Sequence, residues 1–389
     1  MPTIAILGAG LMGTAIAVAH LKSGFDVVLY DQHVQPLEDA PQRIASELRM
    51  QNAGATAIER LSRTDNLDII ASSRCSIVIE TIPEKLRAKQ ALYRLLAALY
   101  HDCSSPVLLT NTSTISIAEL AVAVPSRENF CGFHFFHPVR ERSLVEIIPT
   151  SETSPQTLQL VTSHAEQIGK QPIVVGDSPG FLVNRLLNPY LNEALQMLES
   201  GTPLTNIEQA ATAFGMAMGP FRIMDEIGLD VTFHAGWVLH KAFPERVAAS
   251  ELLMELVHRK KLGRKTGEGF YIYKTKQQWD DNGVINEALL QEMIIKKTNA
   301  ASEKEIQERL FFGMLLEACR CVDDKVINSL TTADIAVVKG LGFPKERGGL
   351  TQWLKNYGIE KANETLKMLE EKYGKSFCPS GCFRESFKL

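Results

Sequence analysis

The stretch TIAILGAGLMGTAIAVAHLK, residues 3–22, carries the strongest structural signal in the sequence. An apolar run typical of a buried strand leads directly into the motif GAGLMG and then into apolar residues at helical spacing. A G-x-G-x-x-G motif between a strand and a helix indicates a dinucleotide-binding turn. Gly8 permits the tight turn, Gly10 lets a pyrophosphate approach the backbone, and Gly13 lets helix and strand pack closely.

A carboxylate at the end of the next apolar run indicates which dinucleotide the turn suits. FDVVLYD ends in Asp31, 18 residues after Gly13. An acid at this place accepts hydrogen bonds from both ribose hydroxyls and repels a 2′-phosphate, so the pattern favours NAD over NADP. Flavins use the same fingerprint, and the motif alone therefore leaves the redox chemistry open. A glycine-rich turn without a ligand is the structural alternative.

The two halves of the 389-residue chain differ in periodicity. In the first half, apolar runs alternate with helical segments, in the order TIAILG, FDVVLYD, CSIVIETI, PVLLTNTS, FCGFHFF, LVEIIP and PIVVGD. This alternation predicts an α/β domain with a doubly wound, parallel sheet of the Rossmann type. From Ser178 to Leu389 long amphipathic patterns predominate, so this region is expected to be all helix. The tripeptide Ser178-Pro179-Gly180 marks the junction and the expected helix start.

The helical half contains an internal repeat. LLNPYLNEALQML and LFFGMLLEACRCV share their apolar rhythm, and each is followed by a helix, a glycine turn and another helix. The matching positions are Arg185, Glu193 and Ala194 with Arg309, Glu317 and Ala318, each 124 residues apart, and Gly228 with Gly358, 130 apart. We therefore expect three domains, at 1–178, 179–275 and 300–389, with a polar linker and one short helix before the last. Chance similarity between two amphipathic helix pairs is the alternative.

Composition excludes several classes of protein. Lys plus Arg is 41 against 45 for Asp plus Glu, so nothing electrostatic points to a nucleic acid. No uncharged apolar run approaches the ~18 residues that a membrane span needs. The seven cysteines are scattered and odd in number, which is typical of a reducing compartment, and the start goes straight into a strand-like run without a leader. We expect a cytoplasmic protein.

Polar groups follow three of the predicted strands, where a doubly wound sheet binds its ligands. They are residues 80–89, the tripeptide Asn111-Thr112-Ser113, and His134 within GFHFFHPV. Histidine, with an unperturbed pKa of ~6.5, can take the hydroxyl proton of an alcohol near neutral pH. Glu146 lies in the apolar run LVEII, where a carboxylate is costly unless paired, so it is a candidate partner. A satisfied core histidine is an equally good interpretation of His134 from the residues alone.

The sequence resembles the L-3-hydroxyacyl-CoA dehydrogenases of fatty acid β-oxidation over almost its whole length. The similarity runs through GAGLMGTAIA, IETIPEKLRAK, TNTSTISI, GFHFFHPV, LVEII, DSPGFLVNRLLNPYLNEA, MGPFRIMDEIGLD and GRKTGEGFYIY. Residues 300–389 resemble the second helical repeat of the multifunctional fatty acid oxidation enzymes, here without a hydratase domain. The resemblance implies NAD-dependent oxidation of an L-3-hydroxyacyl-CoA to the 3-ketoacyl-CoA.

The resemblance also implies roles for individual residues. His134 would be the general base, Glu146 its partner, Ser113 a ligand of the substrate oxygen, and Asn184 a contact of the acyl-CoA. The residues expected at the cofactor are Gly8, Gly10, Leu11, Met12, Gly13, Asp31, Glu84, Lys89, Ser113, His137 and Lys265. From the residues alone, Glu84 as a helix-dipole partner, Ser113 as a helix cap and Lys265 as a solvated charge are the ordinary alternatives.

One position departs from the family pattern. The family segment is normally HFFNP, whereas this chain has His137 in place of the Asn that contacts the cofactor. The substitution puts the cofactor geometry in doubt and places a second titrating group three residues from the proposed base. His134-x-x-His137 is too incomplete to predict a metal site, and so are Cys378 with Cys382 and Cys319 with Cys321. No metal is expected.

Two rival functions remain open at this level. One is a related NAD-dependent hydroxy acid or sugar acid dehydrogenase on the same scaffold, and the other is a non-catalytic NAD-binding protein. In single-repeat relatives the helical domain is the dimer surface, so the in-chain copy predicts a monomer, with a differently paired homodimer as the alternative. Association with other β-oxidation enzymes is a further expectation from the resemblance.

Overall fold

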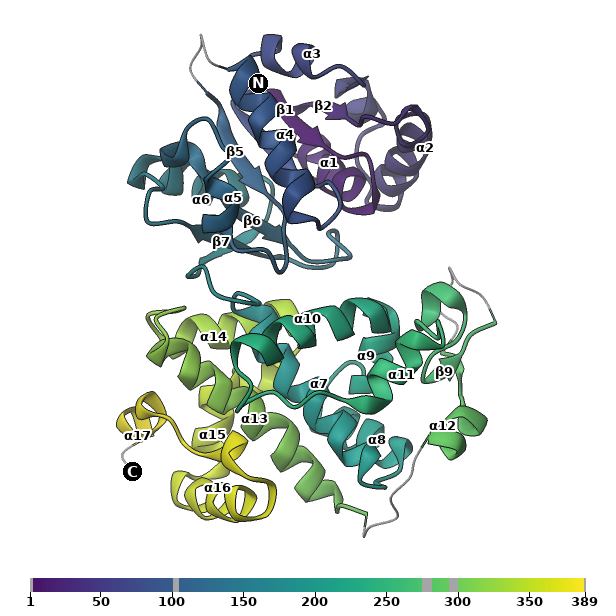
Figure 1. The fold of residues 1–389 in the computed structure, drawn as a ribbon, viewed down its shortest axis with the longest axis vertical. Coiled ribbons are helices and arrows are strands. Elements are labelled where there is room, and N and C mark those ends of the chain that lie inside the picture. Colours follow the sequence, from purple (N-terminus) through teal and green to yellow (C-terminus); the bar gives the residue numbers. More distant parts are fainter. Residues whose placement is uncertain (1–2, 101–104, 275–281, 294–299, 388–389) are drawn as a thin grey trace. The chain divides into compact units, whose positions relative to one another are not determined.

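The computed structural model describes the chain except for residues 1–2, 101–104, 275–281, 294–299 and 388–389. It divides into two compact units, Met1–Phe181 and Leu182–Leu389 (Figure 1). The first unit is an α/β unit and the second is mostly helical. None of the described helices combines the length and the apolar character that crossing a bilayer requires.

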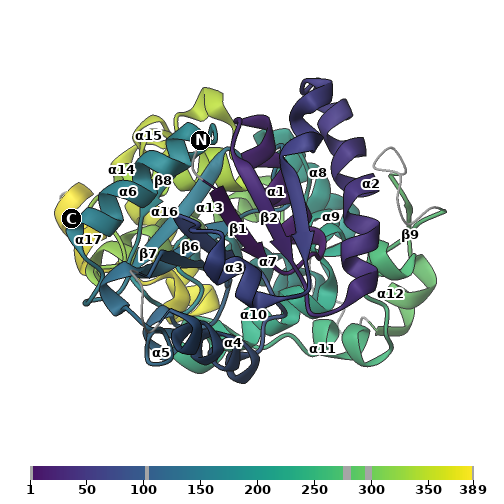
Figure 2. The same ribbon diagram turned by 90° about the horizontal axis from the view of Figure 1, so that it is seen from above.

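The first unit is built on one eight-stranded sheet (Figure 2). Its strand order is β3-β2-β1-β4-β5-β6-β7-β8, in which the first six strands have the 3-2-1-4-5-6 order of a Rossmann sheet. The parallel, doubly wound arrangement predicted from the sequence is therefore confirmed for those strands. The strands are β1 (Thr3–Leu7), β2 (Asp26–Tyr30), β3 (Leu61–Thr64), β4 (Ile77–Glu80), β5 (Val107–Thr110), β6 (Phe130–Phe135), β7 (Leu144–Pro149) and β8 (Gln171–Val174).

Helices cover both faces of this sheet. Apolar side chains of α1, α2 and α6 form one core with alternate residues of the strands. On the opposite face, Tyr93 of α4 packs its ring edge against Phe130 of β6. The helical elements of this unit are α1 (Leu11–Lys22), α2 (Val34–Met50), η1 (Ala55–Arg60), α3 (Leu67–Ser72), α4 (Leu86–Leu99), α5 (Ile117–Ala121), η2 (Arg127–Asn129) and α6 (Pro155–Gln167).

Two features of the sheet differ from the sequence-based expectation. Strand β3 was not predicted, because LSRT has no apolar run and buries only Thr64 fully. Strand β7 runs antiparallel to β6, although a parallel sheet was predicted. Only eight residues connect Phe135 to Leu144. A parallel crossover needs a dozen or more residues, so a connection of this length turns the chain back antiparallel.

The described residues of the second unit are mostly helical, and a small antiparallel ribbon of β9 and β10 adds two short strands to the predicted helices. Its first helix begins at Val183 and not at Gly180, because Gly180 and Phe181 have positive φ angles of 75° and 49°. The elements are α7 (Val183–Glu199), α8 (Leu204–Phe214), α9 (Pro220–Ile227), α10 (Leu229–Ala242), α11 (Glu251–His258), η3 (Arg264–Thr266), β9 (Tyr271–Ile272), β10 (Val284–Ile285), α12 (Glu287–Met293), α13 (Glu303–Asp323), α14 (Leu330–Ala336), η4 (Val337–Leu341), η5 (Lys345–Arg347), α15 (Leu350–Tyr357), α16 (Ile359–Tyr373), η6 (Lys375–Phe377) and α17 (Gly381–Phe387).

The predicted repeat is visible in the backbone of this unit. Helices α7 and α13, which begin the two copies, pack along each other (Figure 1). In the first copy Gly228 joins α9 to α10 with φ 100° and ψ 128°, and in the second Gly358 joins α15 to α16 with φ 94° and ψ 123°. A side chain rarely adopts this backbone conformation, so both copies place glycine there. The predicted linker contains α12, while residues 275–281 and 294–299 lie outside the described residues.

Two buried ion pairs cross between α7 and α13 in a reciprocal pattern. Arg185 Nε of α7 donates to Glu317 Oε1 of α13 at 2.7 Å, and Arg309 Nε of α13 donates to Glu193 Oε2 of α7 at 2.8 Å. Glu193 and Glu317 are equivalent positions in the two copies. The arginine of each copy therefore pairs with the glutamate of the other copy. Such an exchange of equivalent contacts is the signature of a two-fold interface between like units. The two copies associate within one chain as two subunits would.

Two histidines meet in the core of the first unit. His20 Nε2 of α1 and His164 Nε2 of α6 are 2.9 Å apart, and His20 Nδ1 is bound to the carbonyl of Ile16 at 2.7 Å. A hydrogen bond between the two rings needs one donor and one acceptor, which two charged imidazoles cannot supply. Burial lowers the pKa of His20 to about 4 and that of His164 to about 3. Both rings are therefore neutral at pH 7.

We predict an acid-dependent loss of stability from this pair. The unfolded chain protonates both imidazoles below pH ~6.5, whereas the folded chain resists protonation down to pH ~4, so the free energy of unfolding is constant above this window and falls within it. His164→Gln should make the fall shallower by roughly 1.4 kcal/mol per pH unit, the effect of one proton. Urea unfolding at pH 7, 6 and 5 measures this difference. The exposed His33→Gln is the control, and equal slopes in both variants would contradict the prediction.

Candidate active site

The glycine turn between β1 and α1 has a steric requirement at two of its three glycines, Gly8 and Gly13. Gly8 has φ of 111°, and a Cβ on it would lie 2.8 Å from Thr81 Oγ1. A Cβ on Gly13 would lie 1.8 Å from the carbonyl oxygen of Gly8, so this helix residue can only be glycine. Around Gly10 no atom of the described chain lies within 4 Å of the Cβ position. The turn is thus closed on its sheet side and open at Gly10, a shape that fits the pyrophosphate of a dinucleotide at the N-terminus of α1.

Asp31 follows β2 and binds the same turn. Its Oδ2 accepts a hydrogen bond from the backbone N–H of Ala9 at 2.8 Å, and its Oδ1 accepts from the N–H of His33 at 3.0 Å. These bonds hold the carboxylate beside the glycine turn. Each carboxylate oxygen has further acceptor capacity, which is what ribose hydroxyls require. The position suits the role predicted for Asp31, and Leu11 begins α1 with an exposed side chain.

His134 and Glu146 lie directly opposite each other on the antiparallel strands β6 and β7. His134 Nδ1 and Glu146 Oε2 are 2.7 Å apart, and both side chains are buried. The rings of Phe136 and Phe181 pack against the imidazole, with centroid distances of 4.5 and 5.8 Å. Within the described part of the chain, the opposite ring nitrogen, Nε2, has no hydrogen-bond partner. The carboxylate orients the ring and leaves one nitrogen for a ligand.

Four buried polar side chains on adjacent strands share one face of the sheet. They are Glu80 of β4, Thr110 of β5, His134 of β6 and Glu146 of β7. Their strand neighbours, such as Ile79, point to the core on the opposite face, and side chains of a strand alternate between faces. The carboxyl ends of β4, β5 and β6 therefore bring a row of polar groups to the face that α4 covers.

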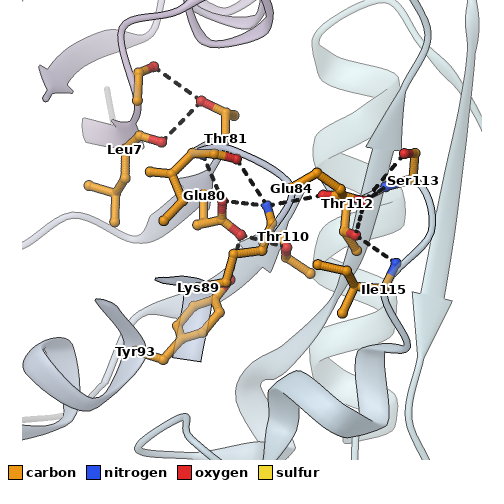
Figure 3. Close-up of polar contacts among 12 residues, drawn as sticks. Leu7, Glu80, Thr81, Glu84, Lys89, Tyr93, Thr110, Thr112, Ser113 and Ile115 are labelled. Atoms are coloured by element: carbon orange, nitrogen blue, oxygen red, sulfur yellow. Dashed lines mark hydrogen bonds and ion pairs between the residues drawn. The ribbon is translucent and has the colours of Figure 1, made fainter. Parts of the chain in front are cut away.

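One carboxylate oxygen of Glu84 accepts several hydrogen bonds from the turn after β5. This atom, Oε1, accepts a hydrogen bond from Thr112 Oγ1 at 2.6 Å (Figure 3). The same oxygen accepts from the backbone N–H groups of Ser113 and Thr114 at 2.9 and 3.0 Å. The hydroxyl groups of Ser113 and Thr114 also donate to it. Burial works against the charge of Glu84, but the Lys89 ammonium and these donors outweigh it and lower its pKa. Glu84 is therefore ionised at neutral pH and holds Ser113 in place.

Lys89 lies between two carboxylates, and only one of them was predicted as a site residue. Its Nζ is 2.6 Å from Glu80 Oε1 and 3.6 Å from Glu84 Oε2, and its side chain has no exposed surface (Figure 3). The sequence analysis placed Glu80 at the start of the polar segment 80–89 but gave it no role in the site. The signal was present, because a carboxylate at the end of the apolar run CSIVIE is as costly as Glu146 in LVEII unless it is paired.

Asn111 connects the turn after β5 to the histidine strand. Its Oδ1 accepts a hydrogen bond from the backbone N–H of Phe135, the residue after His134, at 2.8 Å. Thr112 Oγ1 in turn accepts from the N–H of Ile115 at 3.1 Å. The tripeptide predicted from the sequence is thus brought to the histidine by its asparagine, while Ser113 is held by Glu84.

His137 lies in the loop after β6 and is joined to Pro138 by a cis peptide bond. Desolvation by the surrounding loop lowers the pKa of the His137 imidazole, and the positive charge of Arg140 lowers it further. The ring is therefore mostly neutral at neutral pH. The second titrating group, expected three residues from His134, therefore has a lower pKa than an ordinary histidine.

Two of the predicted site residues belong to the second unit. Asn184 is in the first turn of α7, and Lys265 is in η3, where its ammonium pairs with Asp230. Among the described residues no group of three His, Cys, Asp or Glu side chains is arranged to hold a metal ion.

Family comparisons cover most of the chain. The model described as 3-hydroxyacyl-CoA dehydrogenase, NAD binding domain, matches residues 3–178. The model for the C-terminal domain of the same family matches residues 180–273.

The chain is similar to several solved structures, and some of these matches cover almost its whole length. (S)-3-hydroxybutyryl-CoA dehydrogenase PaaH1 from Ralstonia eutropha is 33% identical, with 71% of this chain and 100% of that chain covered and a TM-score of 0.65. The dehydrogenase part of multifunctional enzyme 1 from C. elegans is 25% identical, with coverage of 98% and 89% and a TM-score of 0.69. A 3-hydroxybutyryl-CoA dehydrogenase from Escherichia coli K12 is 24% identical, with coverage of 100% and 98% and a TM-score of 0.86, and shows the same fold from end to end.

The glycine turn yields a matched pair of variants. Gly13→Ala should lower the free energy of unfolding by roughly 1–3 kcal/mol, because its methyl group overlaps the Gly8 carbonyl. Gly10→Ala should change this free energy by less than ~0.5 kcal/mol, because its methyl group meets open space. It should nevertheless weaken NAD binding, which calorimetric titration measures. Equal stability of the two variants in urea would refute the steric assignment.

Proposed function

Because the chain belongs to the 3-hydroxyacyl-CoA dehydrogenase family, we propose that it oxidises L-3-hydroxyacyl-CoA thioesters to 3-ketoacyl-CoA in fatty acid β-oxidation. The enzyme uses NAD, as its NAD-binding domain shows. The observation that carries the proposal is the buried His134–Glu146 pair in the same unit as the glycine turn. An alcohol dehydrogenase needs such a base together with a dinucleotide site.

In the proposed reaction, His134 acts as the general base. Its Nε2 takes the proton of the substrate's 3-hydroxyl group while the hydrogen on the same carbon leaves as hydride. NAD supplies the hydride acceptor when it is bound. Glu146 holds Nδ1 and stabilises the imidazolium that the proton transfer creates. Burial of the pair among Phe136 and Phe181 strengthens this electrostatic interaction.

Further roles rest on the resemblance together with the geometry. Ser113 would bind the substrate oxygen, and Glu84 supports this by holding the serine's backbone. Asn184 is proposed to bind the acyl-CoA. The proposed contacts of NAD are Gly8, Gly10, Leu11, Met12, Gly13, Asp31, Glu84, Lys89, Ser113, His137 and Lys265. His137 has an uncharged ring near neutrality, so it would offer the cofactor a single hydrogen bond in place of the family's amide.

We also propose that the enzyme works as a monomer in the cytoplasm, alongside other β-oxidation enzymes. The reciprocal Arg185–Glu317 and Arg309–Glu193 pairs support the monomer, because the second copy already covers the face that a partner subunit would use. The six described cysteines are free thiols, which suits a reducing compartment.

A substrate panel tests the activity. The enzyme is mixed with reduced NAD and 3-ketoacyl-CoA thioesters of several chain lengths, and the loss of nicotinamide absorbance is followed. The matching free acids form the second arm. Turnover of the thioesters alone supports the proposal, turnover of the free keto acids favours the rival dehydrogenase, and NAD binding without any turnover favours a non-catalytic protein.

We predict that His134→Gln lowers kcat by roughly 10²–10⁴-fold, the usual contribution of a general base, while the Kd for NAD stays within about twofold. Glu146→Gln should lower kcat less and move the acid limb of the rate profile to lower pH, because an amide stabilises an imidazolium poorly. Steady-state kinetics across pH, with calorimetry for NAD, measure both effects. Wild-type turnover by His134→Gln would rule out the base, and an unmoved acid limb in Glu146→Gln would rule out the pairing.

Light scattering should give the mass of one chain. Charge reversal at Arg309→Glu should destabilise the protein, because it sets two buried carboxylates against each other on α7 and α13. The exchanged pair Arg309→Glu with Glu193→Arg should recover part of that stability in urea unfolding. A wild-type mass of two chains would contradict the monomer.

A further inference from the structure

We propose that Glu80 is a positioning residue for the site: its buried carboxylate engages the Lys89 ammonium so that Glu84 remains bound to the turn carrying Ser113. The link to catalysis rests on the proposed function. The positioning itself is a property of the folded chain and can be measured without substrate.

Glu80 is placed as a fixed anion. It ends β4, has no exposed surface, and accepts hydrogen bonds from four donors among the described residues (Figure 3). Oε1 accepts from Lys89 Nζ at 2.6 Å and from the N–H of Ile82 at 2.7 Å. Oε2 accepts from Thr110 Oγ1 at 2.7 Å and from the Tyr93 hydroxyl at 3.3 Å. Four donors hold the carboxylate rigidly and offset the cost of its burial.

Glu84 divides its two oxygens between two tasks. Oε1 holds the turn through Thr112, Ser113 and Thr114, while Oε2 faces Lys89 at the longer distance of 3.6 Å. Lys89 is therefore bound tightly to Glu80 and only loosely to Glu84. The ammonium supplies enough positive potential to keep Glu84 ionised but does not draw it away from the turn.

The competition between the two carboxylates gives Glu80 its role. If Glu80 were neutral, Glu84 would be the only anion beside a fully buried ammonium, and a closer ion pair would form. Closing the 3.6 Å gap moves Glu84 away from the N–H groups of Ser113 and Thr114. Lys89 of α4 is the charged group that lowers the pKa of Glu84, and Lys89 is itself bound to Glu80 of β4, so the Glu80–Lys89 pair sets the balance.

The sheet connects this cluster to His134. Glu80 is in register with Thr110, and Thr110 with Gly132, two residues before His134. With strands ~4.8 Å apart and ~3.3 Å per residue, the Glu80 and His134 backbones are roughly 12 Å apart on the same sheet face. Between them, Asn111 binds the N–H of Phe135. A shift of the turn after β5 would therefore reach both Ser113 and the histidine strand.

The first test is Glu80→Gln in the full-length protein. Amide hydrogen exchange of residues 112–116 is measured without ligands, and we expect the protection of the Ser113 and Thr114 amides to fall at least tenfold. With acyl-CoA and NAD present, KM for the acyl-CoA should rise about tenfold, and the Kd for NAD should rise as well, because Glu84, Lys89 and Ser113 are also proposed contacts of NAD. Tyr93→Phe removes a neutral donor from the same carboxylate and is the matched control, expected to leave all three quantities within twofold.

A second variant keeps the proposal testable if Glu80→Gln does not fold. Glu80→Met with Lys89→Met replaces the buried ion pair by apolar side chains of similar size, which proteins often tolerate. Glu84 then lacks its cation, so its pKa should rise and the Ser113 and Thr114 amides should lose protection as the pH falls from 7 to 5. Wild-type amides should keep their protection over this range, because Lys89 lowers the pKa of Glu84.

The outcomes separate the two proposals. Unchanged protection of the Ser113 and Thr114 amides in both variants would overturn the role of Glu80, whatever the enzyme's activity. Wild-type protein that turns over no 3-ketoacyl-CoA would overturn the proposed function, while the exchange data would still decide the positioning. Loss of protection throughout the unit, and not only at residues 112–116, would also overturn it by showing a general loss of structure.

Discussion

Glu146 is fully buried in an apolar strand, and a carboxylate in that position costs free energy unless a hydrogen-bonding partner meets it. His134 meets it across the β6–β7 pair at 2.7 Å. This contact exists only because β7 runs antiparallel to β6, which sets residues 134 and 146 in register. The rest of the site depends on this one reversal of strand direction, because it orients the imidazole and leaves its other nitrogen for a ligand.

The same face of the sheet carries a second buried carboxylate, Glu80, which is also paired. Glu80 is as buried as Glu146, but its partner is the Lys89 ammonium, with hydroxyl and backbone donors around it. One buried carboxylate therefore orients an imidazole ring, and the other is paired with an ammonium group. The turn after β5 lies between them, tied to the Lys89 side by Glu84 and to the histidine strand by Asn111.

In the second unit, buried carboxylates on two helices are also paired with positive charges. Arg185 and Arg309 are equivalent residues of two copies, and each meets the other copy's glutamate. Packing two like helices face to face buries equivalent positions together, so complementary charges must occur in both copies. Asn184, which was predicted to contact the acyl-CoA, was not duplicated with its helix: the position 124 residues after it is Glu308, whose carboxylate pairs with Tyr357 and Lys304.

Patterns along the chain were enough to predict seven of the eight strands, the glycine turn with Asp31, the helical second half and its repeat. These features depend on periodicity, on backbone freedom at glycine and on the cost of burying charge, all of which are local. Strand β3 was not predicted because its residues lack an apolar run. The ribbon of β9 and β10 was not predicted because a two-residue strand is too short to show a period. The direction of β7, the shared face of Glu80 and His134, and the reciprocal pairs of α7 and α13 were decided by the tertiary structure. They depend on which distant segments become neighbours, and a single position in a sequence does not record its neighbours in space.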